Sequence, residues 1–215
     1  MGDDEDSGGG KAIAAIALAC VLVVALPIVL VAALTGTVID KDQCGTGPQI
    51  MAQGVSGPTG VTLPGLSERQ LAQARNVVAI GKKRNLPESV IKANLYAEAT
   101  ESSYRNLANP NVPESLTFPH DGEGTDHDSV GPNQLRAGIW GSVGMATLMN
   151  PTYQINWFYD QAVKIPGYEH MDSAELSQAV ERSGPNAYSK SVELGNAIFE
   201  KFKDVDPGET AECVE

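Results

Sequence analysis

Apolar residues follow two patterns in this chain, one long run near the start and shorter periodic stripes farther on. The run from Ala12 to Ile39 contains no charged residue. Its part up to Leu34 already exceeds the roughly 20 residues that cross the hydrocarbon core of a bilayer. Pro27 lies inside the run, and membrane helices tolerate such a proline. The pattern predicts a transmembrane helix over residues 12–39.

A cleaved signal peptide is the alternative for the same run. Signal peptides begin with a basic segment and have an apolar core of about 7–15 residues. Here the leader, residues 1–11, reads MGDDEDSGGGK and is acidic, and the apolar run is longer. We therefore expect an uncleaved span, with residues 1–11 as an acidic cytoplasmic tail.

The periodic stripes begin after a segment of different composition. Residues 40–65 are rich in Gly, Pro, Ser and Thr and lack a helical period, which predicts a flexible linker. Ser67 and Gln70 then form a capping-box pattern before a stripe of apolar residues at helical spacing. A second helix is predicted after Pro87, because proline is favoured in the first turn.

The region after this helix, from Asn106 to Gly144, is dense in Pro, Gly and Asp, and it carries two aromatic residues, Phe118 and Trp140. Irregular runs of this length in a compact domain are either functional or disordered, and the aromatic residues favour order. Helical patterns resume in NPTYQINWFYDQAVKI, DSAELSQAVERS and NAYSKSVELGNAIFEKF. The pattern predicts a mainly α domain over residues 66–202 and an acidic tail over 203–215. Trp157, Phe158 and Tyr159 are expected in its core.

Charge and cysteines narrow the class of protein. The chain has 27 acidic and 15 basic residues, a net charge of −12, so it repels phosphate backbones and nucleic-acid binding is not expected. Cys44 and Cys213 bracket the part after the membrane run, which suggests a disulfide and an oxidising exterior. Two free thiols are the alternative. We expect the C-terminal domain on the outer, cell-wall side.

Glu101 is the first candidate for chemistry. It lies in the last turn of the second predicted helix, where the helix dipole disfavours an anion, and its sequence neighbours are small or apolar. Desolvation would raise its pKa further, and a carboxyl that keeps its proton near neutral pH suits a general acid. Glu98, three residues earlier, is expected to be an ordinary surface residue.

Three segments resemble a known family: ESSYRNL from Glu101, DHDSVGPNQLR from Asp126, and the later PNAYSK. Together they resemble the lysozyme-like, transglycosylase-type domains of actinobacteria, their phages and their conjugative elements, over residues 66–202. The resemblance implies that Glu101 is the catalytic carboxylate. It also implies a group of substrate-binding residues, with Trp140 as a candidate wall of the cleft: Ser102, Ser129, Gly131, Gln134, Trp140, Asn186 and Tyr188. The chain departs from the family at Pro132 and Asn133, where an apolar or aromatic residue usually precedes the glutamine.

The mechanism implied by the resemblance depends on the number of carboxylates. A lytic transglycosylase needs one group, which first acts as acid and then as base and leaves an anhydro sugar. Hydrolysis of the lysozyme type uses a second carboxylate, for which Asp126 and Asp128 are the candidates. We expect transglycosylation of the MurNAc-GlcNAc bond, without a cofactor.

The acidic loop from His120 to Asp128 has a metal-binding alternative. Its histidines and carboxylates lack the spacing of zinc sites and do not match the calcium loop, so we expect a solvated loop and no metal. A metal-dependent peptidase that used His120 and His127 would be sensitive to chelators and would cut peptides.

Taken together, the sequence predicts a single-pass membrane protein that holds a lysozyme-like domain against the cell wall. Its expected partners are peptidoglycan glycan strands and the membrane, with secretion, conjugation or phage machinery as a further possibility. The alternative is a catalytically silent module that binds the wall or assembles a transmembrane complex. Intact Glu101 and Ser102 favour the enzyme.

Overall fold

The computed structural model of the protein describes residues 55–208. The predicted transmembrane helix, the acidic leader, Cys44 and Cys213 all lie outside these residues. Within residues 55–208, no helix is long and apolar enough to cross a membrane. The described part is mainly α-helical, as the sequence predicted.

The two helices that precede the candidate glutamate begin where the sequence placed them. Helix α2 spans Glu68–Lys83, and the predicted capping box is present: Ser67 accepts from the Gln70 backbone N–H while the Gln70 side chain accepts from the Ser67 N–H. Helix α3 spans Glu88–Glu101 and follows Pro87 directly.

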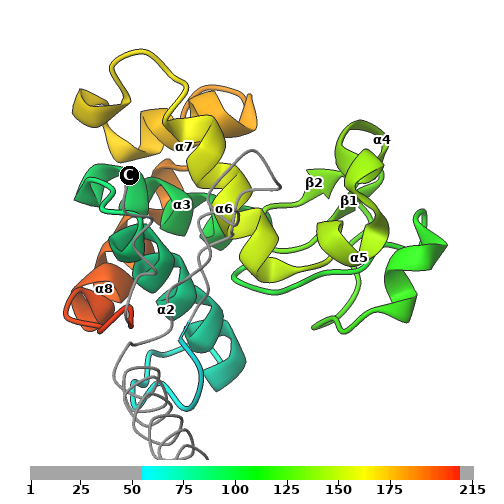
Figure 1. Cartoon of the computed structure of the whole chain (residues 1–215), viewed down its shortest axis with the longest axis horizontal. Helices are drawn as coiled ribbons and strands as arrows, with labels where there is room; N and C mark the ends of the chain where they lie inside the picture. Colours follow the sequence, from blue (N-terminus) through cyan, green and yellow to red (C-terminus); the bar gives the residue numbers. More distant parts are fainter. Residues whose placement is uncertain (1–54, 209–215) are drawn as a thin grey trace, which may run out of the picture. The chain divides into compact units, whose positions relative to one another are not determined.

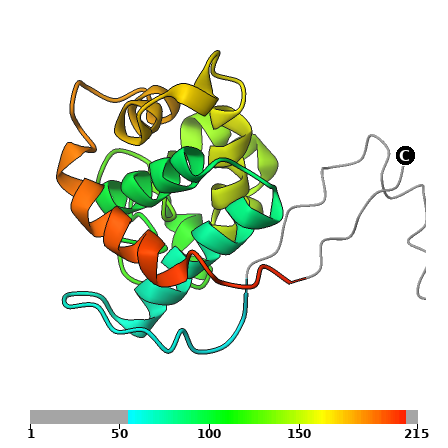
Figure 2. The same cartoon turned by 90° about the vertical axis from the view of Figure 1, so that its left-hand side faces the viewer.

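Helix α3 is the centre of the domain. It packs against α2, α6 (Pro151–Ala162), α7 (Ser173–Glu181) and α8 (Val192–Phe202), which surround it in Figures 1 and 2. Buried residues therefore lie all around α3 instead of along one stripe. A helix in this position can hold a carboxylate away from water at its end.

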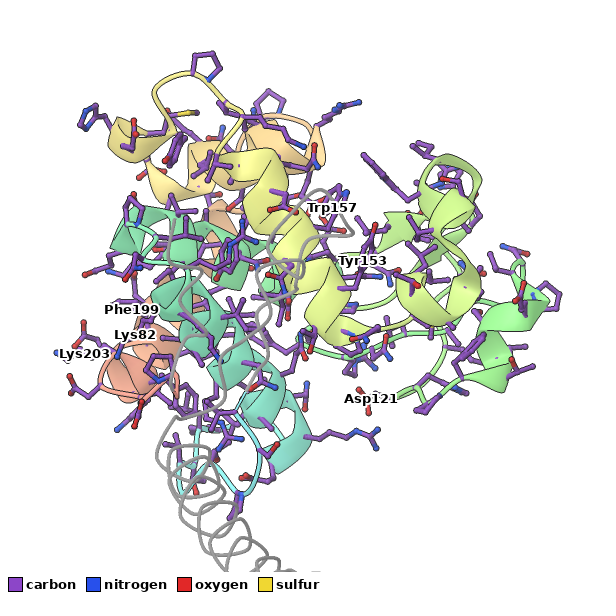
Figure 3. All side chains as sticks on the ribbon, in the orientation of Figure 1. Lys82, Asp121, Tyr153, Trp157, Phe199 and Lys203 are labelled. Carbon is purple, nitrogen blue, oxygen red and sulfur yellow. The ribbon has the colours of Figure 1, made fainter. Side chains whose placement is uncertain are left out.

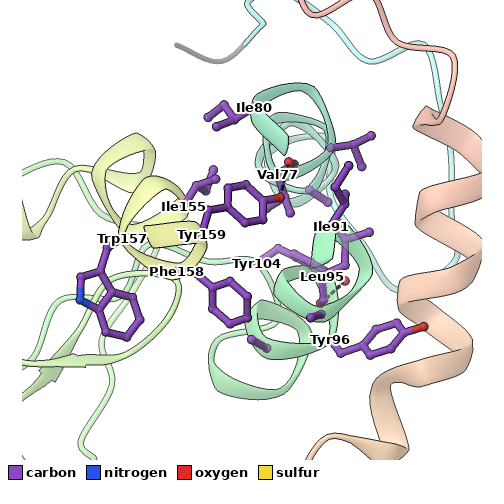
Figure 4. Close-up of a cluster of buried hydrophobic side chains, with 14 of the residues drawn as sticks. Val77, Ile80, Ile91, Leu95, Tyr96, Tyr104, Ile155, Trp157, Phe158 and Tyr159 are labelled. Carbon is purple, nitrogen blue, oxygen red and sulfur yellow. Dashed lines mark hydrogen bonds between the residues drawn. The ribbon is translucent and has the colours of Figure 1, made fainter. Parts of the chain in front are cut away.

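Aromatic residues fill the space between these helices, and the hydroxyls of two tyrosines reach backbone carbonyls (Figure 4). Tyr159 of α6 donates to the Val77 carbonyl at 2.7 Å, and Tyr104 donates to the Leu95 carbonyl at 2.8 Å. Trp157, Phe158 and Tyr159 are all buried, which confirms the prediction that they belong to the core.

Helix α8 approaches α3 closely because Gly195 has no side chain. A Cβ atom at this position would lie 2.3 Å from a ring carbon of Tyr96, closer than packed atoms can come. The sequence pattern placed the start of this last helix at Asn186. The structure begins it at Val192, because a turn and the short 3-10 helix η5 (Ser189–Ser191) come first.

The Pro- and Gly-rich region forms a second, smaller lobe, on the right of Figure 1. Its elements are short: η2 (Pro113–Thr117), β1 (Ser129–Val130), β2 (Leu135–Arg136), α4 (Ala137–Trp140), η3 (Gly141–Val143) and α5 (Met145–Leu148). The strands are antiparallel, with Ser129 opposite Arg136 and Val130 opposite Leu135. The region is ordered, as the aromatic residues indicated.

Asparagine amides hold this lobe together where regular hydrogen bonding is sparse. The Asn109 amide donates to the Ser129 carbonyl at 3.0 Å, and the Asn106 amide donates to the carbonyls of Pro119 and Met149 at 2.9 and 3.0 Å. Both asparagines are buried. Their bonds replace the ladder that a longer sheet would supply.

The described part of the predicted linker, residues 55–65, lies along α2 (Figure 2). Arg75 is buried and donates to the carbonyls of Val55, Pro58 and Gly57 at 2.7–2.9 Å. Glu68 accepts from the backbone N–H and the hydroxyl of Thr59. These residues therefore belong to the folded domain, which extends N-terminal to the predicted start at Leu66.

The C-terminal end of the described chain is also fixed to α2. The Lys82 ammonium donates to the carbonyls of Lys203 and Val205 at 2.7 and 2.6 Å, and Figure 3 shows Lys82 and Lys203 at the same end of the domain.

Between Ala162 and α7, the chain makes the short 3-10 helix η4 (Tyr168–His170).

Candidate active site

Glu101 is the last residue of α3, and its carboxylate contacts a buried tyrosine that lies much later in the sequence. The Tyr188 hydroxyl donates to Glu101 Oε1 at 2.6 Å, and Tyr188 is only 1% exposed. Tyr188 lies in the turn before η5, so α3 and the segment that precedes α8 build this contact together. The structure thus brings together Glu101, the predicted catalytic residue, and Tyr188, one of the predicted substrate-binding residues.

The surroundings of Glu101 favour its protonated form. Burial raises the pKa of the Glu101 carboxyl above its ordinary value, the Tyr188 hydroxyl opposes the rise by stabilising the carboxylate, and the charge of Asp126 adds to the rise. Lys190 lowers the pKa by a smaller amount. A half-buried carboxyl of this kind can give up a proton and later take one back.

The chain turns sharply after Glu101. Ser103 and Tyr104 both have positive φ angles, +55° and +61°, which non-glycine residues rarely adopt. The N–H groups of Ser102 and Tyr104 both donate to the Glu98 carbonyl, and the Tyr104 hydroxyl returns to α3 at Leu95. The strained turn ends the helix at Glu101 and leads the chain into the smaller lobe.

Ser102, predicted to bind substrate, has a structural role in this turn. It is 3% exposed, and its hydroxyl donates to the Glu98 carbonyl at 3.3 Å and accepts from the Arg105 N–H at 3.1 Å. The Ser102 hydroxyl is therefore already engaged within the turn, and this role explains why a serine follows Glu101.

Gly131 and Gln134 form the tip of the β1–β2 hairpin. A Cβ atom at Gly131 would lie 1.9 Å from the Gln154 amide nitrogen, and Gly131 also has a positive φ of +79°, so only glycine fits there. Gln134 has a φ of +49°, and its amide donates to the Gly131 carbonyl at 2.7 Å. The GxxQ pattern thus fixes a turn by side-chain bonding.

The residue before Gln134 is the polar Asn133, and its hydrogen bonds explain its polarity. Asn133 is 1% exposed, its N–H donates to Gln154 Oε1 at 2.9 Å, and its amide donates to the Gln154 carbonyl. Gln154 in turn donates to the carbonyls of Val130 and Leu148. The polar residue before Gln134 is therefore part of a hydrogen-bonded support for the hairpin.

The two candidate second carboxylates differ in how they are engaged. Asp128 accepts from the Arg136 guanidinium and from the Gly138 N–H, and the Arg136 bond lowers the Asp128 pKa below its ordinary value. Asp126 is exposed and bonded to His127 at 2.8 Å, yet its charge acts on Glu101. Asp126 is therefore the better placed of the two. Ser129, one of the predicted substrate-binding residues, is 2% exposed, and its hydroxyl oxygen lies 3.5 Å from Asp126 Oδ2.

The remaining predicted residues lie at the edges of this region. Asn186 is exposed with a φ of +59°, and its N–H donates to the Gln178 side chain at 2.9 Å. Trp140 is half-buried and stacks edge-on against Trp157, with ring centroids 5.1 Å apart. The role of Trp140 as a wall of the cleft stays a prediction.

Two further glutamates lie behind the site, and the sequence interpretation missed both. Glu98 is fully buried, and this overturns its assignment as a surface residue: the Gln73 amide donates to both carboxylate oxygens at 3.0–3.1 Å, and burial raises the Glu98 pKa to about 8. The nearly continuous apolar run ANLYA before it signals a helix buried on all sides.

Glu181 is the second of these glutamates and ends α7. Its Oε1 is inaccessible and has no hydrogen-bond partner among residues 55–208. Burial raises the Glu181 pKa well above its ordinary value, and the charges of Glu101 and Glu98 add to the rise. Burial thus raises the pKa of all three glutamates, and the charges of Glu101 and Glu98 both act on Glu181.

Residues 55–208 contain no group of three or more His, Cys, Asp or Glu side chains that could hold a metal ion. In the acidic loop, His120 Nδ1 lies 2.8 Å from the Phe118 carbonyl and His127 pairs with Asp126, so the two histidines face different partners.

Comparison with known proteins adds no assignment: no family model matches the chain, and no curated protein matches it. The chemistry of the site is therefore inferred from its own geometry.

Proposed function

We propose that the described domain is a lysozyme-like enzyme that cleaves the MurNAc-GlcNAc bond of peptidoglycan, with Glu101 as its general acid and base. The observation that carries the proposal is the half-buried Glu101 carboxyl at the end of α3, held by the buried Tyr188 hydroxyl at 2.6 Å. Its raised pKa supports the acid role, since the group must hold a proton before it can donate one.

In the first step, protonated Glu101 donates its proton to the glycosidic oxygen as the bond to the sugar's anomeric carbon breaks. The leaving sugar departs as an alcohol, and positive charge develops at the anomeric carbon. Glu101 becomes a carboxylate, which the Tyr188 hydroxyl stabilises through its hydrogen bond.

In the second step, the Glu101 carboxylate takes the proton of the substrate's own C6 hydroxyl. The freed oxygen bonds to the anomeric carbon and closes an anhydro ring, and Glu101 regains its proton. No water is consumed. We favour this course over hydrolysis because Asp128 is engaged by Arg136 and Gly138, and Asp126 is exposed and paired with His127.

The membrane anchor, the cell-wall location and any link to secretion, conjugation or phage machinery belong to the same proposal. They rest on the apolar run at residues 12–39, and a tethered domain would cleave only the wall within its reach.

The proposal is tested with labelled peptidoglycan and the full-length protein. Release of soluble label should fall by at least about a hundredfold in Glu101→Gln, the loss typical of a missing general acid. Glu175→Gln, an exposed glutamate on α7, makes the same chemical change and should release label like the wild type. Equal release by both variants would exclude Glu101 as the catalytic group. No release by the folded wild type would favour the silent module.

A further inference from the structure

A groove of about 440 Å³ opens between α2, the loop that follows Asn106, and the junction of α5 with α6. Its size lies within the range of small-ligand sites. None of the residues assigned to the Glu101 site lines it. Figure 3 shows Asp121, one of its lining residues, on the loop across from α2. The groove is therefore a separate feature of the domain.

Two asparagines in the groove have one half of the amide engaged and the other half free. Asn76 Oδ1 accepts from the Val55 N–H at 2.8 Å, and Asn150 Oδ1 caps α6 by accepting from the Thr152 N–H at 2.9 Å. Among residues 55–208, neither Nδ2 group has a partner. Each asparagine can therefore donate to a ligand without giving up its structural bond.

The groove also offers acceptors. Gln73 gives its amide hydrogens to Glu98, so its Oε1 has no partner in the described part of the chain. Asn106 is 7% exposed, and its Oδ1 is a buried oxygen without a partner in the same residues. A ligand here would meet both donors and acceptors, and all of them belong to uncharged amides.

The charged groups of the groove neutralise each other. Arg69 pairs with Asp121 at 2.5 Å, and the second oxygen of Asp121 accepts from the Asn106 N–H at 2.9 Å. A free anion or cation would therefore find little net charge to bind. Ala72, Phe118 and Met149 supply apolar surface beside the amides.

We propose that this groove binds a neutral N-acetylamino sugar, as a second glycan-binding site apart from Glu101. Hydroxyl and acetamido groups both donate and accept, which matches the uncharged amides, and the C–H face of a sugar ring matches the apolar surface. The choice of a glycan rests on the proposed function. A second site would hold a strand on the domain between cleavage events.

The test uses the full-length chain carrying Glu101→Gln, so that binding is measured without cleavage, and the N-acetylglucosamine tetramer as probe. Asn76→Asp and Asn150→Asp each keep the bonded oxygen and replace the free donor with a carboxylate oxygen, and the control below carries the same added charge. Each should weaken the binding measured by calorimetry roughly tenfold, the change for one lost hydrogen bond. Asn196→Asp is the matched control, because Asn196 also accepts one bond, from Tyr96 at 2.7 Å, and does not line the groove.

Equal affinity in all three variants would overturn the proposal, as would the absence of binding to the folded protein. The side-chain amide NMR signals of Asn76 and Asn150 should shift on binding, and shifts confined to Gln134 and Asn186 would instead place the sugar at the Glu101 site. Because cleavage is not measured, failure of this test leaves the proposed reaction standing. Absence of release by the wild type in the labelled-wall assay would refute the proposed reaction, and binding of the tetramer to the groove would still be measured separately.

Discussion

Glu98 and Glu101 lie less than one turn apart on α3 and have different surroundings. Glu98 faces the core and the Gln73 amide, whereas Glu101 reaches the helix end and the Tyr188 hydroxyl. The sequence made Glu101 a candidate through its position at the helix end and through the resemblance of Glu101 and Ser102 to the Glu-Ser of lysozyme-like domains. It could not identify Glu98, because the side chain that engages it comes from another helix.

The hydrogen bond from Tyr188 sets how readily Glu101 loses its proton. Tyr188→Phe removes a donor that stabilises the carboxylate, so the pKa of Glu101 should rise further. A general acid works only while it is protonated. The basic limb of the kcat/KM profile against pH should therefore move to higher pH, with a lower kcat because the carboxylate formed in the first step loses its partner.

Tyr104→Phe is the control for this prediction. It removes another buried hydroxyl, which bonds to the Leu95 carbonyl instead of a carboxylate. This variant should lose stability and leave the pH limb in place. A limb that moves equally in both variants, or in neither, would show that Tyr188 does not tune Glu101.

At the scale of secondary-structure elements, the sequence predicted the features that are determined by residues close together in the chain. The capping box of α2, the start of α3 and the core aromatic residues of α6 all follow from residues near one another. The β1–β2 hairpin could not be predicted this way. Each strand has two residues, and the side chain of Gln154, from α6, holds the hairpin through two hydrogen bonds, one from the Asn133 N–H and one to the Val130 carbonyl.

Helix α3 carries a pH-dependent cost through Glu98. Its pKa of about 8 in the folded domain lies above the ordinary value of 4.5, so the folded state binds more protons between these values. Stability must therefore fall as pH rises from 4.5 to about 8, by on the order of a few kcal/mol. Below 4.5 both states are protonated and the effect vanishes.

Glu98→Gln should remove this slope, because glutamine stays neutral and can still accept from Gln73. Urea unfolding of both proteins at pH 5 and pH 8 measures the effect as a difference, in which the other titrating groups largely cancel. The variant should gain stability over the wild type at pH 8 and match it at pH 5. A parallel loss in both proteins would mean that Glu98 is ionised in the folded domain.

At the scale of the whole molecule, long side chains of α2 fix both ends of the described chain. Arg75 binds three carbonyls of residues 55–58, and Lys82 binds two near residue 204. Composition predicted a flexible linker up to residue 65, because this segment is rich in Gly, Pro and Ser and its apolar residues show no helical period. It could not reveal that one buried arginine would organise part of that segment.

Arg75→Met should release residues 55–58 from α2. The three carbonyls lose their donor, so the free energy of unfolding should fall by roughly 1–3 kcal/mol, and the Val55 N–H should exchange faster with solvent. Arg69→Met on the same helix removes an arginine whose side chain is 69% exposed and whose ion pair is worth under about 1 kcal/mol. Unchanged exchange at Val55 in Arg75→Met would refute the role of this arginine.

The central claim is that Glu101 acts as both acid and base on a glycan strand. Its most direct test is mass spectrometry of peptidoglycan digested with the full-length protein, beside the Glu101→Gln variant. The account predicts anhydro-muramyl ends that disappear in the variant. Reducing ends would mean that water attacks and would direct attention to Asp126, while products that persist in Glu101→Gln would contradict the account.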